Sequence, residues 1–133
     1  MSFTEAELAY LSTQRLGRLA TVDPDGEPQN NPVGFRYNPE TGTIDIGGYT
    51  MGTTRKFRNV QANGRAALVV DDVASRDPWR VRGIEIRGVA EAVRGATPPM
   101  PHLSDDIIRI HPRRIISWGI ERFGPGMSRR DVA

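Results

Sequence analysis

The sequence predicts a small, mainly β protein whose strands form one antiparallel barrel. Short apolar segments are separated by the turn sequences at 23–26 (DPDG) and 38–42 (NPETG), a pattern typical of hairpins. Apolar and polar side chains alternate along 80–94, as they do in a strand with one buried face. Two segments have a helical pattern, and the remainder gives six or seven short strands, which is enough for a small closed barrel.

The first half of the chain is expected to contain one helix and three strands. Capping-box patterns that begin at Ser2 and at Thr4 predict a helix over residues 4–13. Pro28 and Pro32 should make the second strand irregular or place it at an edge, because proline cannot donate to a sheet. The three strands are expected at 16–22, 29–37 and 43–48.

The second half is expected to contain one helix and four strands. The helix at 53–62 should stop at Asn63-Gly64, since glycine favours the backbone conformation that ends a helix. Loops are expected at 74–78 and 95–102, and a corner at His111-Pro112 should separate the last two strands. The strands themselves are expected at 65–72, 80–94, 107–110 and 114–120.

The composition limits the classes of function. A chain of 133 residues is expected to form a single domain, residues 1–133. It has no cysteine, so neither a disulfide framework nor a thiolate metal site is expected. No apolar run approaches the roughly 18 residues of a membrane span, and the first residues lack a signal-peptide pattern, so we expect no membrane partner and a cytoplasmic location. A net charge of +2 does not by itself indicate a nucleic-acid partner.

Basic residues gather in one segment without acidic neighbours. Between Asp45 and Asp71 the chain has no acidic residue but four cationic ones, which are Arg55, Lys56, Arg58 and Arg65. A helix N-terminus adds unpaired N–H groups and a partial positive charge. The sequence therefore predicts a phosphate site where Thr53 and Thr54 lead into Arg55 and Lys56. By residue type alone, a solvated basic helix surface is the competing interpretation.

The order of these residues resembles the pyridoxamine-phosphate-oxidase-like flavoproteins. In that family a Tyr-Thr pair ends a strand, and a Ser/Thr-Arg-Lys run opens the next helix and grips the flavin phosphate. This chain has Tyr49-Thr50 and then Thr54-Arg55-Lys56. The resemblance covers most of the chain. The segments 71–79, 82–93 and 109–121 resemble in particular the branch that uses the deazaflavin coenzyme F420.

The resemblance implies a homodimeric FMN-binding split β-barrel with a cofactor site in each cleft between subunits. A barrel of this size is filled by side chains, so the cofactor must lie outside it. Trp79 and Arg80 could reach the partner's cofactor, or serve only as a loop anchor and a surface charge. The cofactor-binding residues that the resemblance implies are Asn31, Pro32, Val33, Gly48, Tyr49, Thr50, Thr54, Arg55, Lys56, Trp79 and Arg80.

Two departures argue against the vitamin B6 oxidase itself. That enzyme has an Arg-Gln pair at the start of its fifth strand, and the glutamine contacts the flavin ring. The matching pair here is Arg82-Gly83. The chain also ends in SRRDVA, without the arginine-bearing segment that holds pyridoxal phosphate in that enzyme.

The resemblance therefore implies an F420-dependent oxidoreductase. It would transfer a hydride from the reduced deazaflavin to a conjugated, electron-poor C=C or C=N of a small planar substrate, and the proton would come from Tyr49, His102 or water. Two alternatives stay open: an FMN-binding oxidase or reductase of the same fold, and a non-enzymatic flavin, deazaflavin or haem-binding protein. His102 and His111 are the only histidines and have neither a cysteine nor a paired carboxylate with them, so no metal site is predicted.

Overall fold

The computed structural model describes residues 2–121 and 126–132 and contains one seven-stranded antiparallel sheet in this part of the chain. The sheet order is β3-β2-β1-β4-β5-β6-β7, and a further pairing of β3 with β6 closes it into a barrel. The prediction of a mainly β fold with six or seven antiparallel strands is confirmed. The strands are β1 (Leu16–Val22), β2 (Pro28–Asn38), β3 (Thr43–Gly47), β4 (Arg65–Arg76), β5 (Trp79–Val93), β6 (Ile107–Trp118) and β7 (Ser128–Asp131).

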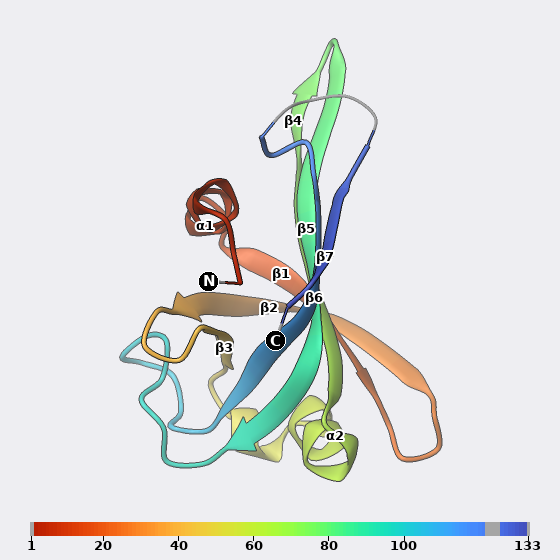
Figure 1. The fold of residues 1–133 in the computed structure, drawn as a ribbon. Helices are drawn as coiled ribbons and strands as arrows, with labels where there is room; N and C mark the ends of the chain where they lie inside the picture. The colour runs from red at the N-terminus through yellow and green to blue at the C-terminus, as the bar shows by residue number, and fades with distance from the viewer. Residues whose placement is uncertain (1, 122–125, 133) are drawn as a thin grey trace.

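Strand β6 pairs with β5 along one edge and has two different neighbours along its other edge, and this splits the barrel. Its first half pairs with β3, with Ile110 opposite Ile44. Its second half pairs with β7, with Ile116 opposite Arg129. The long β4–β5 hairpin runs past the barrel at this point, and its tip lies at the opposite end of the molecule from α2 (Figure 1).

The barrel interior is filled with apolar side chains. Isoleucines dominate it, and one side of the core is covered by α2 through Phe57, which is fully buried. No space for a cofactor is therefore expected inside the barrel. The fully buried isoleucines are Ile44, Ile46, Ile84, Ile86, Ile107, Ile108, Ile110 and Ile115.

The two α-helices begin and end at the residues that their capping chemistry dictates. Helix α1 (Glu5–Ser12) has the capping box of Thr4 and Glu7, one of the two patterns in the sequence. Helix α2 (Arg55–Asn63) begins two residues later than expected, because a single 3₁₀ turn, η1 (Met51–Thr53), precedes it and Thr54 is its N-cap. It ends at Gly64, whose φ of 67° is the left-handed conformation that glycine adopts without strain. No helix in the described residues is long and apolar enough to cross a membrane.

The prediction of a loop at 74–78 is wrong. Strand β4 continues to Arg76, and β5 begins at Trp79, so the connection is only Asp77-Pro78. A register shift between Val73 and Ser75 lets the pairing continue through this segment. The hairpin is consequently longer than predicted and carries Trp79 to its tip.

The prediction of a corner at His111-Pro112 is also wrong, because β6 is one continuous strand. Its pairing with β5 shifts register opposite Arg87 and Gly88, so Pro112 lies at a bulge, where a missing N–H is tolerated. Gly88 is needed at this point: a Cβ there would lie 2.1 Å from the carbonyl oxygen of His111.

Strand β7 was not predicted as a strand, and its main contact explains how it is held. Arg130 forms an ion pair with Glu7, whose side chain is only 1% exposed, and donates a hydrogen bond of 2.6 Å to the Ser2 carbonyl oxygen. Burial raises the pKa of Glu7, but the bonds from Arg130, the Thr4 N–H and Ser117 together outweigh it and keep this pKa below its ordinary value. The C-terminal strand is thus joined to α1.

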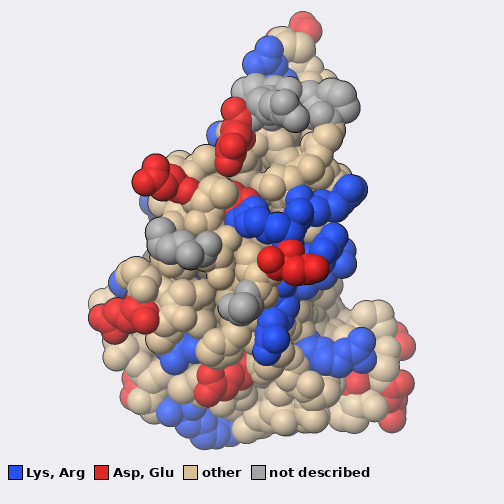
Figure 2. All heavy atoms as spheres, viewed as in Figure 1, with Lys and Arg blue, Asp and Glu red and all other residues tan. Residues whose placement is uncertain are grey.

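In Figure 2, basic side chains form a band over the middle of the molecule, where β6 and β7 lie in Figure 1.

Candidate functional site

The predicted phosphate ligands line one open cavity at the N-terminus of α2. The cavity has a volume of about 630 Å³ and is bounded by β1, the start of β2 and the first turn of α2. Four predicted cofactor residues meet there, since Asn31 lies opposite Thr54, Arg55 and Lys56. The complete lining is Thr21, Gln29, Asn30, Asn31, Thr54, Arg55 and Lys56.

The first turn of α2 presents positive charge without a counter-charge from the described residues. Thr54 caps the helix by accepting a hydrogen bond from the Phe57 N–H at 3.3 Å. Phe57 is buried in the core, which anchors this turn and leaves Arg55 and Lys56 facing outward. Seven arginines are ion-paired with acids, but in the described part of the chain neither Arg55 nor Lys56 is. An anion at this turn would meet both cations and the helix N-terminus.

Asn59 fixes α2 against the strands beneath the cavity, and sequence reasoning missed it. It is 3% exposed, and its Nδ2 donates to Thr21 Oγ1 at 3.1 Å and to Gln29 Oε1 at 2.8 Å. The available signal was its place in α2: Asn59 precedes Val60, which shares the buried face with Phe57 at a spacing of three residues, so Asn59 borders the face that packs on the barrel. A buried amide on such a face needs polar partners on the opposing strands.

Tyr49 and His102, the two proton-donor candidates, lie beside each other. Their ring centroids are 5.8 Å apart, although the residues come from different loops. The loop before β6 is held against the end of β3, because Ser104 N–H donates to the Gly48 carbonyl at 3.0 Å. Gly47 allows this close approach, since a Cβ there would lie 2.8 Å from Leu103 and Pro99. Tyr49 is 78% exposed, so its hydroxyl is accessible from solvent.

The remaining predicted residues are not all gathered at the cavity. On β2, the side chain of Pro32 is exposed, whereas that of Val33 is buried in the core, so any contact with a ligand there would use the Val33 backbone. Trp79 and Arg80 lie at the tip of the β4–β5 hairpin, distant from α2 within one chain (Figure 1). Gly48 and Thr50 are beside η1.

Position 83 has no room for the glutamine of the vitamin B6 oxidase. Gly83 is buried, and a Cβ there would lie 2.5 Å from Cζ2 of the Trp118 ring on the neighbouring strand. Any larger side chain would have to displace the indole. The Trp118 ring therefore occupies space beside β5 that a longer residue at 83 would need.

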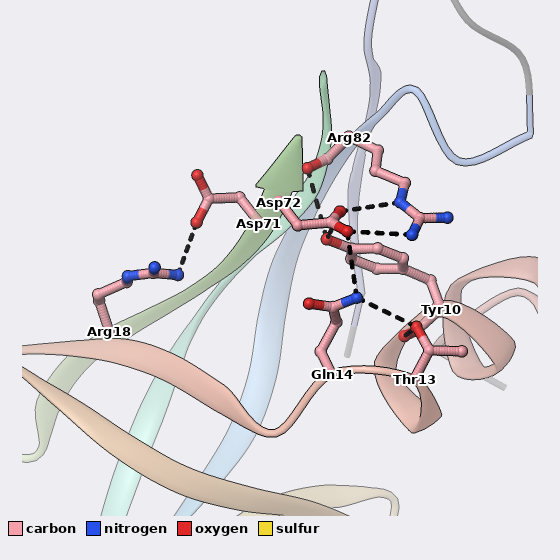
Figure 3. Close-up of polar contacts among 7 residues, drawn as sticks. All are labelled: Tyr10, Thr13, Gln14, Arg18, Asp71, Asp72 and Arg82. Carbon is pink, nitrogen blue, oxygen red and sulfur yellow. Dashed lines mark hydrogen bonds and ion pairs between the residues drawn. The ribbon is translucent and has the colours of Figure 1, made fainter. Parts of the chain in front are cut away.

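A second polar cluster joins α1 to the base of the hairpin (Figure 3). Asp72 accepts two bonds from Arg82, at 2.8 and 3.0 Å, and one from the Tyr10 hydroxyl at 2.9 Å. Burial and the bond to Asp72 raise the pKa of Tyr10, so this phenol stays protonated. On the other face of β4, Asp71 forms an ion pair with Arg18 at 2.7 Å.

These two carboxylates have arginine partners. Among the described residues, no group of three or more His, Cys, Asp and Glu side chains is arranged to hold a metal ion.

Comparison with known proteins places the chain in a family. The family model described as pyridoxamine 5'-phosphate oxidase matches residues 3–123. A relative from Streptomyces rimosus, named 5a,11a-dehydrotetracycline/5a,11a-dehydrooxytetracycline reductase, is 52% identical over 134 residues, which is 99% of this chain and 94% of that protein.

Solved structures with low sequence identity share the fold. A conserved hypothetical protein from Mycobacterium tuberculosis superposes with a TM-score of 0.68 at 24% identity, covering 89% of this chain and 86% of that one. A heme-binding protein from Mycobacterium smegmatis gives a TM-score of 0.70 at 18% identity, covering 98% of this chain and 59% of that one.

Proposed function

The chain belongs to the pyridoxamine 5'-phosphate oxidase family, and we propose that it is a cytoplasmic reductase that uses the deazaflavin coenzyme F420. The observation that carries the proposal is the cavity in which Arg55 and Lys56, without acidic partners in the described residues, flank the capped N-terminus of α2. Its donors are those that a cofactor phosphate requires. The 52% identical relative supports the reductase activity, since it is named as a reductase.

The cofactor would lie on the outside of the barrel, with its phosphate in this cavity and its ring along β2. Thr54 would support the phosphate, and the exposed Asn31 and Pro32 would lie beside the ring. The backbone of Val33 is the part of that residue available to the ring edge, because its side chain is in the core. Gly48, Tyr49 and Thr50 would border the ring at the end of β3.

When bound, reduced F420 supplies a hydride. The protein's residues bind the coenzyme, orient it toward the substrate and exclude water. Hydride addition to a conjugated C=C leaves negative charge on the substrate, and a proton must follow. Tyr49 and His102 are the donors we propose for this proton. Their rings lie 5.8 Å apart. The loop after β3 would supply Tyr49, and the loop before β6 would supply His102.

The substrate we propose is a conjugated, electron-poor polycyclic molecule of the dehydrotetracycline type, by analogy with the relative from Streptomyces rimosus. Trp79 and Arg80 would cover the cofactor of a partner subunit. In one chain they are remote from the cavity, and Trp79 is 68% exposed, as expected of a side chain that another surface covers. We therefore propose a homodimer with two equivalent sites.

FMN is the alternative cofactor, because it also carries a phosphate at the end of its tail. The environment of Gly83 weighs against it: the vitamin B6 oxidase uses a glutamine there, and the Trp118 ring excludes one here.

The proposed activity is tested by turnover. Purified protein, reduced F420 and 5a,11a-dehydrotetracycline are mixed without oxygen, and oxidised deazaflavin is followed by absorbance and product by mass spectrometry. We expect one equivalent of coenzyme to be oxidised for each substrate that gains two hydrogens. Reduction with FMNH₂ at an equal or higher rate would show that the protein is a flavin-dependent enzyme. No turnover with either cofactor would contradict the proposal.

A further inference from the structure

Asn59 uses both of its amide hydrogens on residues that line the cavity. Its Nδ2 donates to Thr21 Oγ1 and to Gln29 Oε1, at 3.1 and 2.8 Å. Asn59 is 3% exposed and Thr21 is 1% exposed, so the bond between them is shielded from competing water, and the donor of the bond to Gln29 is itself buried. The orientation of the Gln29 amide is consequently set by a buried donor.

This orientation determines which end of the Gln29 amide faces the cavity. Its Oε1 is taken by Asn59, and the Nε2 at the other end of the same planar amide has no hydrogen-bond acceptor among the residues described by the structure. Gln29 is half-buried and lines the same cavity as Arg55 and Lys56. Gln29 thus adds to the cavity lining an amide whose N–H donors have no acceptor among the described residues.

We propose that Gln29 donates a hydrogen bond to the anionic group held by Arg55 and Lys56, and that Asn59 is the positioning residue that keeps the Gln29 amide in this orientation. The inference rests on the proposed function, because it assumes that the cavity holds the phosphate of the cofactor. Without Asn59, the Gln29 amide can rotate and present Oε1, an oxygen that repels a phosphate. Asn59 would therefore affect ligand affinity through Gln29, without touching the ligand.

The test is a double-mutant cycle on binding. Gln29→Met keeps the length of the side chain and removes its donor, and Asn59→Leu keeps the branched shape and removes both donated bonds. Dissociation constants are measured by fluorescence for F420 and for its phosphate-free deazaflavin precursor. We expect each single variant to bind F420 about tenfold more weakly, with little change for the phosphate-free compound.

The double variant separates a positioning role from a structural one. If Asn59 acts through Gln29, the double variant binds F420 no more weakly than Gln29→Met alone. Additive losses, or equal losses for both ligands, would mean that Asn59 only supports α2 and would overturn its positioning role. An unchanged affinity of Gln29→Met for F420 would overturn the inference as a whole, even if Asn59→Leu proved too unstable to measure.

Lys56→Ala in the same experiment distinguishes failure of this inference from failure of the proposed function. If Lys56→Ala weakens F420 binding and Gln29→Met does not, only the role of Gln29 and Asn59 is refuted. If neither variant weakens binding, the anionic group lies elsewhere, and the proposed phosphate site is refuted with it.

Discussion

Replacing Lys56 by alanine should weaken binding of the phosphate-bearing cofactor while leaving the free protein as stable as before. Lys56 is half-buried at the cavity and has no ion pair within the described residues, so its loss leaves no buried acid without a partner. A hydrogen bond to a charged group contributes about 1.5–3 kcal/mol, which corresponds to a dissociation constant raised about 10- to 150-fold. The melting temperature of the cofactor-free protein should stay within about 2 °C of wild type, since surface substitutions usually change stability by less than 0.5 kcal/mol.

The assay is fluorescence titration with F420, and Arg65→Ala is the matched control. Arg65 is exposed at the start of β4, at the opposite end of α2, so its variant has the same change in net charge without the change at the cavity. We expect Arg65→Ala to bind almost as wild type. Equal losses in the two variants would show that only overall charge matters, and wild-type affinity in Lys56→Ala would refute the phosphate site.

Three further predictions concern the framework and the hairpin. Asp45, 5% exposed and bonded twice to Arg109, has a pKa that burial would raise but that the Arg109 bonds hold below its usual value. Asp45→Asn should therefore lower the free energy of unfolding by about 3 kcal/mol near neutral pH. This difference should shrink as the pH falls below about 4, because the Asp45 carboxyl is protonated in the unfolded state before it is protonated in the folded state, and urea titrations at several pH values would measure it. Arg130→Ala leaves the carboxylate of Glu7 buried without its main partner and should cost about 3–5 kcal/mol by urea unfolding, partly recovered when Glu7→Gln is added. Trp79→Ala should weaken F420 binding without lowering the melting temperature; unchanged affinity would contradict the proposal that the hairpin covers a partner's cofactor.

Local patterns in the sequence were enough to predict most of the fold. The turn sequences at 23–26 and 38–42 and the alternation along β5 depend on neighbouring residues, and the corresponding strands lie where they were expected. Features that depend on distant partners were not predicted. The bulge at Pro112 exists because Gly88, far away in the sequence, lets β6 approach β5, and no pattern around His111 indicates this. Strand β7 forms on β6 and is held by Glu7 at the other end of the chain.

The candidate site likewise contains residues that local patterns predict and residues that depend on distant partners. Thr54, Arg55 and Lys56 are consecutive, so a helix start brings them together, and their convergence in one cavity was predictable. Asn59 was not, because its role requires knowing that β1 and β2 lie beneath α2.

The contact between Tyr49 and His102 depends on how two loops fold against each other. The sequence could name both rings as candidates but could not show that they are neighbours.

Titrating the wild-type protein with oxidised F420 and, separately, with FMN is the measurement that shows whether this barrel binds a deazaflavin by its phosphate. We expect micromolar or tighter binding of F420 and much weaker binding of FMN. Tighter binding of FMN would contradict the choice of cofactor, and binding of neither would contradict the claim that the cavity at the N-terminus of α2 is a cofactor site.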